Sequence, residues 1–181
     1  MIELLAVLTV VAQAAVAVTL GCWLVQRLST RRPLDALTAL VHRDALRLAA
    51  LVAIVAMAGS LYMSEVRHFQ PCPLCWYQRI AMYPLALVLL VAALRDDRRV
   101  GWYALPLAVV GIAVGSYHYQ LERFPDQEAI ACSSSVPCTT IWFEQFGYIT
   151  IPMMALSAFA LVATLVWLGG RDHGQGSTNE A

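Results

Sequence analysis

The chain has 181 residues, of which 60% are apolar, and its formal net charge is zero. A soluble domain averages about 45–50% apolar residues, so this composition disfavours a soluble protein. The sequence carries no basic stripe of the kind that binds nucleic acid, and we expect no nucleic-acid partner.

Five apolar blocks are each long enough to cross a bilayer, whose hydrocarbon core needs roughly 20 helical residues. Lipid offers the backbone no hydrogen-bond partner, so each block is predicted to be a helix. These blocks indicate an all-α membrane protein. In chain order they are 4–25, 45–64, 76–94, 100–119 and 148–168.

The first block is interpreted as a transmembrane helix rather than a secretion signal. No basic residue precedes its apolar run, where the only charged residue is Glu3, and no clear small-residue cleavage site precedes Arg27. Residues 1–44 are therefore predicted to be a transmembrane helix followed by a cytoplasmic connector, with a short amphipathic helix over 33–42. The polar tail, 171–181, is predicted to be disordered and cytoplasmic.

Arginines account for all 12 basic residues, and their positions predict the orientation in the membrane. On an alternating path, nine of them fall on one side, and only Arg67, Arg79 and Arg123 fall on the other. The positive-inside rule places the nine in the cytoplasm. We therefore expect a multi-pass protein of a bacterial cytoplasmic (inner) membrane, with its cysteine loops on the oxidising, extracytoplasmic side.

The first cysteine pair is a C-x-x-C motif, Cys72 and Cys75, directly before the third block. Pro73 stiffens the turn between the two sulfurs. We expect Cys75 to lie at a helix start, where free N–H groups and the helix dipole favour a thiolate. A thiolate attacks disulfides, so the motif predicts redox chemistry. A structural bridge and half of a zinc site are the alternatives.

Arg79 follows Cys75 by four residues, which places the two side chains on the same helical face. A charge just inside a membrane span is costly and usually functional. We expect the guanidinium to stabilise the Cys75 thiolate or to donate hydrogen bonds to a carbonyl oxygen of a bound ligand. The alternative is an arginine that snorkels to the interface.

The second pair, Cys132 and Cys138, lies in a polar, turn-rich loop after the fourth block. Such a loop is predicted to be exposed and mobile, which makes a disulfide there labile and open to an external protein thiol. By itself this pair is as compatible with a structural bridge as with catalysis. Its position on the same side of the membrane as the first pair favours exchange between the two.

Two further side chains need an interpretation. His118 lies near the outer end of the fourth block and is a candidate proton donor or ligand contact, with a simple polar cap as the alternative. Cys22, near the cytoplasmic end of the first block, is interpreted as a small hydrophobic residue.

Three motifs resemble a known family. They are Pro-Cys-Pro-Leu-Cys-Trp-Tyr-Gln-Arg-Ile at 71–80, Ser-Tyr-His-Tyr-Gln-Leu at 116–121 and Phe-Gly-Tyr-Ile-Thr-Ile-Pro at 146–152. Together with Pro137-Cys138, they resemble the disulfide bond formation protein B family, DsbB and its BdbC-type relatives, over about 45–170. The resemblance implies a four-helix transmembrane bundle over 45–170, to which the first block adds one N-terminal transmembrane helix.

The resemblance also implies a function, that of a membrane thiol:quinone oxidoreductase. Such a protein reoxidises a DsbA-like thioredoxin-fold oxidase and passes the electrons to a membrane quinone, either ubiquinone or menaquinone. By motif, Cys75 would face the quinone with Cys72 as its partner, while Arg79 would bind or polarise the quinone. His118 would lie nearby. Cys132 would exchange with the partner oxidase, and Cys138 would connect back to Cys72.

The chain departs from the family pattern in two respects: its first span lies outside the usual four, and its second cysteine pair is closely spaced. Two other interpretations remain open. One is a vitamin K epoxide reductase-like enzyme, although there the loop cysteines precede the C-x-x-C motif. The other is a non-enzymatic membrane protein with structural disulfides or a zinc site formed by the cysteines of both pairs.

Overall fold

The computed structural model describes residues 1–28, 35–127, 132 and 136–170. The predicted disordered tail, 171–181, lies outside the described residues, as does the middle of the predicted connector. Residues 35–42, most of the short helix predicted over 33–42, are helical and continue into the helix whose membrane-spanning stretch begins at Asp44. The division of the chain into domains remains a prediction.

Five long helices make up the described part of the chain, and all five are long and apolar enough to cross a membrane. This confirms the predicted all-α membrane fold. The helices are α1 (Ile2–Leu28), α2 (Asp35–Leu61), α3 (Pro73–Arg95), α4 (Gly101–Arg123) and α5 (Ile151–Gly169). Short helical turns also occur, at Tyr62–Val66, Arg98–Val100 and Pro125–Gln127.

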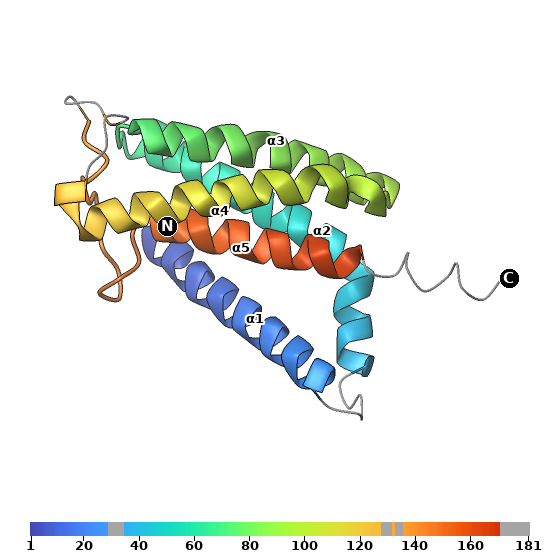
Figure 1. Cartoon of the computed structure of the whole chain (residues 1–181). Helices are drawn as coiled ribbons and strands as arrows, with labels where there is room; N and C mark the ends of the chain where they lie inside the picture. The colour runs from blue at the N-terminus through green and yellow to red at the C-terminus, as the bar shows by residue number, and fades with distance from the viewer. Residues whose placement is uncertain (29–34, 128–131, 133–135, 171–181) are drawn as a thin grey trace, which may run out of the picture.

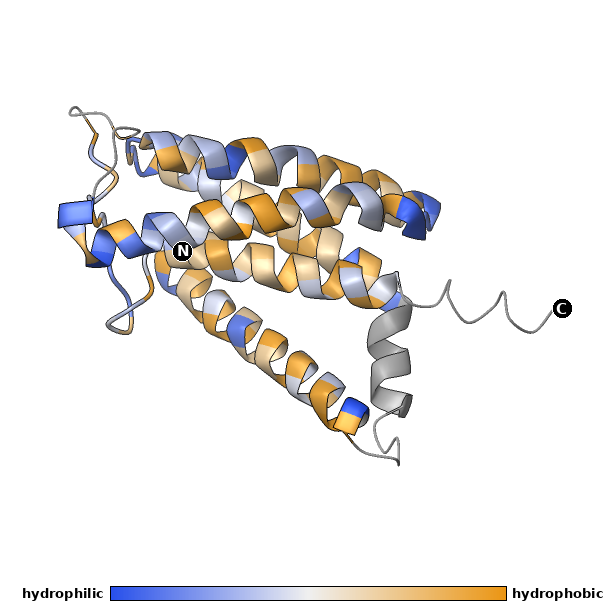
Figure 2. Cartoon of the chain, in the orientation of Figure 1, coloured by the Kyte–Doolittle hydropathy of each residue, from blue (hydrophilic) through white to orange (hydrophobic). Residues whose placement is uncertain are grey.

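Helices α2 to α5 form a bundle, and α1 packs against α5 at an angle to it (Figure 1). Apolar residues predominate along the coloured parts of the helices, while polar residues gather at the helix ends and in the loops (Figure 2). Small residues let the helices approach closely, as is usual in membranes. Gly111 of α4 is one example, because the ring of Phe159 on α5 occupies the space that a side chain there would need.

Local sequence explains where α3 begins and ends. Pro73 occupies the first turn, where its missing N–H costs nothing, and Cys72 is the N-cap. Asp96 ends the helix in a left-handed conformation with φ of 51°. The helix therefore starts three residues before the predicted span of 76–94. Cys75 lies inside its first turn rather than ahead of it.

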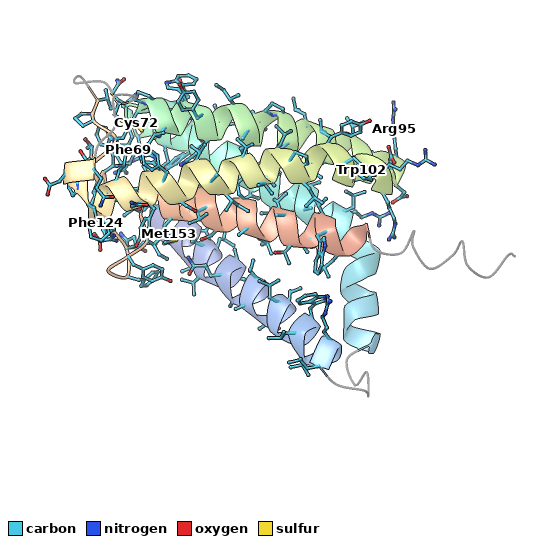
Figure 3. The ribbon with its side chains drawn as sticks, in the orientation of Figure 1. Phe69, Cys72, Arg95, Trp102, Phe124 and Met153 are labelled. Carbon is cyan, nitrogen blue, oxygen red and sulfur yellow. A yellow bond between two sulfur atoms is a disulfide. The ribbon has the colours of Figure 1, made fainter. Side chains whose placement is uncertain are left out.

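The two ends of the bundle differ in chemistry. Figure 3 shows Phe69, Cys72 and Phe124 at one end and Arg95 and Trp102 at the other. Both cysteine pairs belong to one cluster at the first end, in which Cys72, Leu74, Leu121 and Cys138 are buried and Cys75 and Cys132 are partly buried. The structure thus brings together the four cysteines that the sequence singled out.

Candidate functional site

The C-x-x-C pair is built into the start of α3. Cys72 and Cys75 are free thiols here, and their Sγ atoms are hydrogen-bonded to each other over 2.9 Å. The backbone N–H of Cys75 also donates to the Cys72 sulfur, at 3.2 Å. Cys72 therefore acts as the N-cap of the helix, and its sulfur accepts the bonds that α3 offers at its N-terminus.

His118 of α4 lies against the same sulfur. Its side chain is buried, and Nε2 is 3.5 Å from the Sγ of Cys72. Its other ring nitrogen, Nδ1, is 3.2 Å from the side-chain nitrogen of Gln78. When the Gln78 amide donates to Nδ1, the ring carries its proton on Nε2 and directs it at Cys72. Gln78 thus orients His118.

These donors act on the acidity of Cys72. The hydrogen bond from the Cys75 thiol lowers the pKa of Cys72 to about 4, and the hydrogen bond with His118 contributes to this lowering against the opposing effect of burial. The sequence had suggested a thiolate at Cys75. The structure favours Cys72 instead, because the N-cap residue rather than the residue inside the first turn receives the free N–H groups.

Arg79 is anchored on α2. Its Nε donates to the hydroxyl of Ser60 over 3.0 Å, and its Nη2 donates to the Ser60 carbonyl over 2.9 Å. Ser60 lies just before the π-helical turn Tyr62–Val66 that ends α2. The guanidinium also lies over the ring of Trp76, with 5.3 Å to the ring centroid. These contacts hold Arg79 in place, and two bonds use only part of its five N–H donors.

A cavity of 340 Å³ opens beside the C-x-x-C pair and is lined by α1, α2, α3 and α5, together with Phe69–Pro71 and Trp142. Cys75, Gln78 and Arg79 line it, whereas Cys72 and His118 do not. The predicted site residues therefore divide into two groups. Cys75 and Arg79 face the cavity, whereas His118 contacts Cys72 and lies outside the cavity lining.

Most of the cavity wall is apolar, and its polar groups come mainly from the region of Cys75, Arg79 and Ser60. A ring with carbonyl oxygens and a hydrocarbon tail fits this division, because donors and a thiol meet one part and apolar side chains meet the rest. The residues present therefore suit a membrane quinone.

The second pair is a disulfide between Cys132 and Cys138. Cys138 is 1% exposed, and Cys132 is partly buried. The prediction of an exposed loop pair was thus wrong for Cys138, because this residue packs into the same cluster as Cys72 and Leu121. Cys132 is the more accessible sulfur of the two.

Two contacts hold the segment that follows this disulfide. Trp142 stacks on Phe69, with 5.0 Å between ring centroids, and Glu144 pairs with Arg123 of α4 over 3.5 Å. The segment is therefore fixed to the end of the bundle by both contacts.

Sequence reasoning missed two residues of this region, Gln78 and Glu122. Gln78 is a polar residue within an apolar span, one position before Arg79, and that was its available signal. Glu122 lies four residues after His118 on α4, is buried, and accepts a hydrogen bond from Thr150 at the start of α5. An acidic residue near a span end resembles an ordinary interfacial charge, so its burial could not be read from the sequence.

The zinc alternative requires the four cysteines of both pairs, whereas the structure groups only three possible ligands in the part of the chain that it describes. Cys72, Cys75 and His118 place their ligand atoms within 4.8 Å of one another, and they are the one such group among the described residues. Cys132 and Cys138 are bonded to each other in this structure and offer no thiolate. Cys22, on α1, belongs to neither cysteine pair.

Comparison with known proteins gives one family. The model of the family described as disulfide bond formation protein DsbB matches residues 42–169. No solved structure matches the chain.

Three similar curated proteins come from bacilli and related bacteria. Disulfide bond formation protein C of Bacillus subtilis is 48% identical over 119 residues, which cover 65% of this chain and 86% of that protein. A probable disulfide formation protein C of Halalkalibacterium halodurans is 45% identical over 62% of this chain and 82% of its own length. A probable disulfide formation protein of Oceanobacillus iheyensis is 43% identical over 68% and 86%.

Proposed function

Because the chain belongs to the DsbB family and has a role in disulfide bond formation as a multi-pass membrane oxidoreductase, we propose that its electron acceptor is a membrane quinone. The electron donor would be a DsbA-like thioredoxin-fold oxidase outside the cytoplasmic membrane. The observation that carries the proposal is the cavity in which the Cys75 thiol and the anchored Arg79 share one otherwise apolar wall.

The first exchange takes place at the loop pair. A thiolate of the reduced partner attacks the Cys132–Cys138 disulfide, and Cys132 is the more accessible target. The second thiol of the partner then resolves the mixed disulfide. The partner leaves oxidised, and Cys132 and Cys138 are left as a dithiol that holds two electrons.

The second exchange passes these electrons to α3. The Cys138 thiolate attacks the Sγ of Cys72 and breaks the Cys72–Cys75 disulfide, which releases Cys75 toward the cavity. Cys132 then attacks Cys138, restores the loop disulfide and displaces Cys72. A thiolate of low pKa leaves faster, so the donors that lower the pKa of Cys72 to about 4 favour this step.

A bound quinone would accept two electrons and two protons, which are what a dithiol gives up in forming a disulfide. The protein's own contributions are the Cys75 thiol at the cavity wall and the Arg79 guanidinium, held by Ser60 for contact with a carbonyl oxygen. Orientation with both pairs on the extracytoplasmic side follows from the arginine distribution and belongs to this proposal.

The Cys75→Ser substitution tests the proposal. Purified protein receives a reduced thioredoxin-fold oxidase, and the quinone absorbance is followed. Wild-type protein is expected to reduce the quinone continuously. Cys75→Ser is expected to stop turnover, because the attack on Cys72 has no disulfide left to break. Cys22→Ser is the control and should turn over like the wild type.

Two results would contradict the proposal. Normal quinone reduction by Cys75→Ser would remove the C-x-x-C pair from the pathway. Stoichiometric zinc bound through Cys72, Cys75 and His118, with no quinone-dependent thiol oxidation, would favour the structural alternative.

A further inference from the structure

We propose that α1, which precedes the residues matched by the DsbB family, forms one wall of the electron-acceptor site and holds the hydrocarbon tail of the quinone. This inference rests on the proposed function, since it specifies how the cavity beside Cys75 takes its acceptor. It gives a binding role to a helix that the family pattern leaves unexplained.

One face of α1 lines the cavity. Leu5, Leu8, Thr9, Ala12 and Ala15 contribute to the wall. These positions recur at the three- and four-residue spacing of a single helical face. The hydroxyl of Thr9 already donates to the carbonyl of Leu5 over 2.8 Å, so this face presents apolar surface to the cavity.

The cavity is elongated along the helices. Its lining on α2 runs from Leu51 to Ser60 and continues to Met63 in the turn that follows. The separation of 9 residues from Leu51 to Ser60 corresponds to about 14 Å of helix. Its lining on α1 runs from Leu5 to Ala15, a separation of 10 residues or about 15 Å. A space of this shape extends well beyond the region of Cys75 and Arg79 and suits a chain rather than a ring alone.

Specific contacts hold α1 in this position. The side-chain amide of Gln13 donates to the hydroxyl of Ser157 on α5 over 3.0 Å, and its oxygen accepts from the hydroxyl of Tyr148 over 2.8 Å. Near the other end, the rings of Trp23 and Trp167 meet edge to face, with 5.5 Å between centroids. Interhelical hydrogen bonds of this kind fix helix pairs in lipid, so the wall is a built part of the fold.

A close approach to α2 completes the wall. A side chain at Gly59 would begin 3.4 Å from the methyl groups of Leu5, so α1 and α2 contact each other here. The donors that would suit carbonyl oxygens lie on α2 and α3, whereas α1 offers hydrocarbon contact. The geometry therefore divides the site: the ring belongs with Cys75 and Arg79, and the tail belongs with α1.

A matched pair of tryptophan substitutions tests this division. Ala12 lines the cavity and is partly buried, while Ala14 lies two residues away on an exposed face of the same helix. Each variant is assayed with a prenyl-tailed quinone and with a quinone of the same ring without a tail. Wild-type protein should use the tailed quinone at the lower KM.

The Ala12→Trp substitution should raise the KM for the tailed quinone about tenfold, because the indole ring would occupy the space of the tail and overpacking of an apolar site is costly. It should leave the KM for the tailless quinone unchanged. The Ala14→Trp substitution should leave both values unchanged. Equal effects of the two substitutions on the tailed quinone would overturn the inference.

A second measurement does not depend on turnover or on the folding of a variant. Wild-type protein is irradiated with a quinone that carries a photoreactive group on its tail, and the labelled peptides are mapped by mass spectrometry. The label is expected in α1, and excess unmodified quinone should compete it away. Wild-type protein that reduces quinone while α1 stays unlabelled would overturn this inference alone. Wild-type protein that reduces no quinone would overturn the proposed function and this inference with it.

Discussion

The two cysteine pairs differ in how the fold holds them. Cys72 and Cys75 belong to the first turn of α3, where the helix N-terminus, His118 and the cavity surround them. Cys132 and Cys138 belong to the segment between α4 and α5 and are joined to each other. One pair is placed by a helix, and the other is placed by its contacts with the end of the bundle.

Under the proposed function, this difference suits the two pairs to different tasks. The pair on α3 has a fixed environment that sets its acidity and faces one sulfur to an apolar cavity, as electron transfer into the membrane requires. The loop pair offers a partly exposed sulfur at Cys132 and a buried one at Cys138, as exchange between an external protein and the bundle requires. Neither pair provides both features.

The largest expected effect is that of Cys132→Ser, which should abolish oxidation of the partner and leave oxidation of the Cys72–Cys75 pair by quinone intact. In Cys132→Ser, the loop cannot form its disulfide, so turnover with the reduced partner should fall to background. The quinone should still oxidise the chemically reduced Cys72–Cys75 pair, because that pair keeps its cavity and its donors. Quinone absorbance in a single turnover and thiol counting before and after it would measure both reactions.

Cys75→Ser provides the matched control, since it should retain the loop disulfide and oxidise one equivalent of partner while reducing no quinone. If both variants lost both reactions, the two pairs would act as one unit and the division of tasks would be wrong.

The sequence was sufficient to predict the helices and the grouping of the cysteines, because both follow from long-range patterns. Apolar blocks of membrane length and two intervening spans place Cys72, Cys75, Cys132 and Cys138 at one end of the bundle. The four-residue spacing also predicted that Arg79 shares a helical face with Cys75, and both residues line the cavity. These inferences need only helix length, periodicity and the path of the chain.

The electrostatics of the site could not be predicted in the same way. A shift of three residues in the start of α3 makes Cys72 the N-cap, and that detail decides which sulfur receives the N–H donors. Two further features depend on which helices pack against each other: the contact between Gln78 and His118, and the burial of Cys138. Sequence periodicity gives the face of a helix and not the identity of its neighbour.

A titration of Cys72 sharpens the comparison at the first pair. The hydrogen bond from Cys75 and the contact with His118 lower the pKa of Cys72 to about 4. Its thiolate should therefore persist from neutral pH downward and disappear as the pH falls through about 4. Ultraviolet thiolate absorbance would follow it in a variant in which Cys22, Cys132 and Cys138 are replaced by serine.

The contribution of His118 can be isolated by the His118→Phe substitution. Losing a hydrogen bond to a charged sulfur should raise the pKa of Cys72 by about one to two pH units, so the thiolate should disappear at a correspondingly higher pH. The bond from Cys75 remains in this variant, so part of the lowering should persist. A titration that stays near pH 4 would show that His118 does not act on Cys72.

The smallest expected effect concerns the bond that joins α4 to the start of α5, where the segment bearing the second pair ends. The Thr150 hydroxyl donates to the buried Glu122 carboxyl, so Thr150→Val leaves this acceptor without that donor. Loss of a buried hydrogen-bond partner costs about 1–3 kcal/mol. Thermal inactivation in detergent should therefore begin at a lower temperature, whereas Thr140→Val, at an exposed site, should change the inactivation temperature little.

Below the inactivation temperature both half-reactions should keep their rates, since neither Thr150 nor Glu122 lines the cavity. Slowed partner oxidation in Thr150→Val alone would mean that this bond also positions the loop pair.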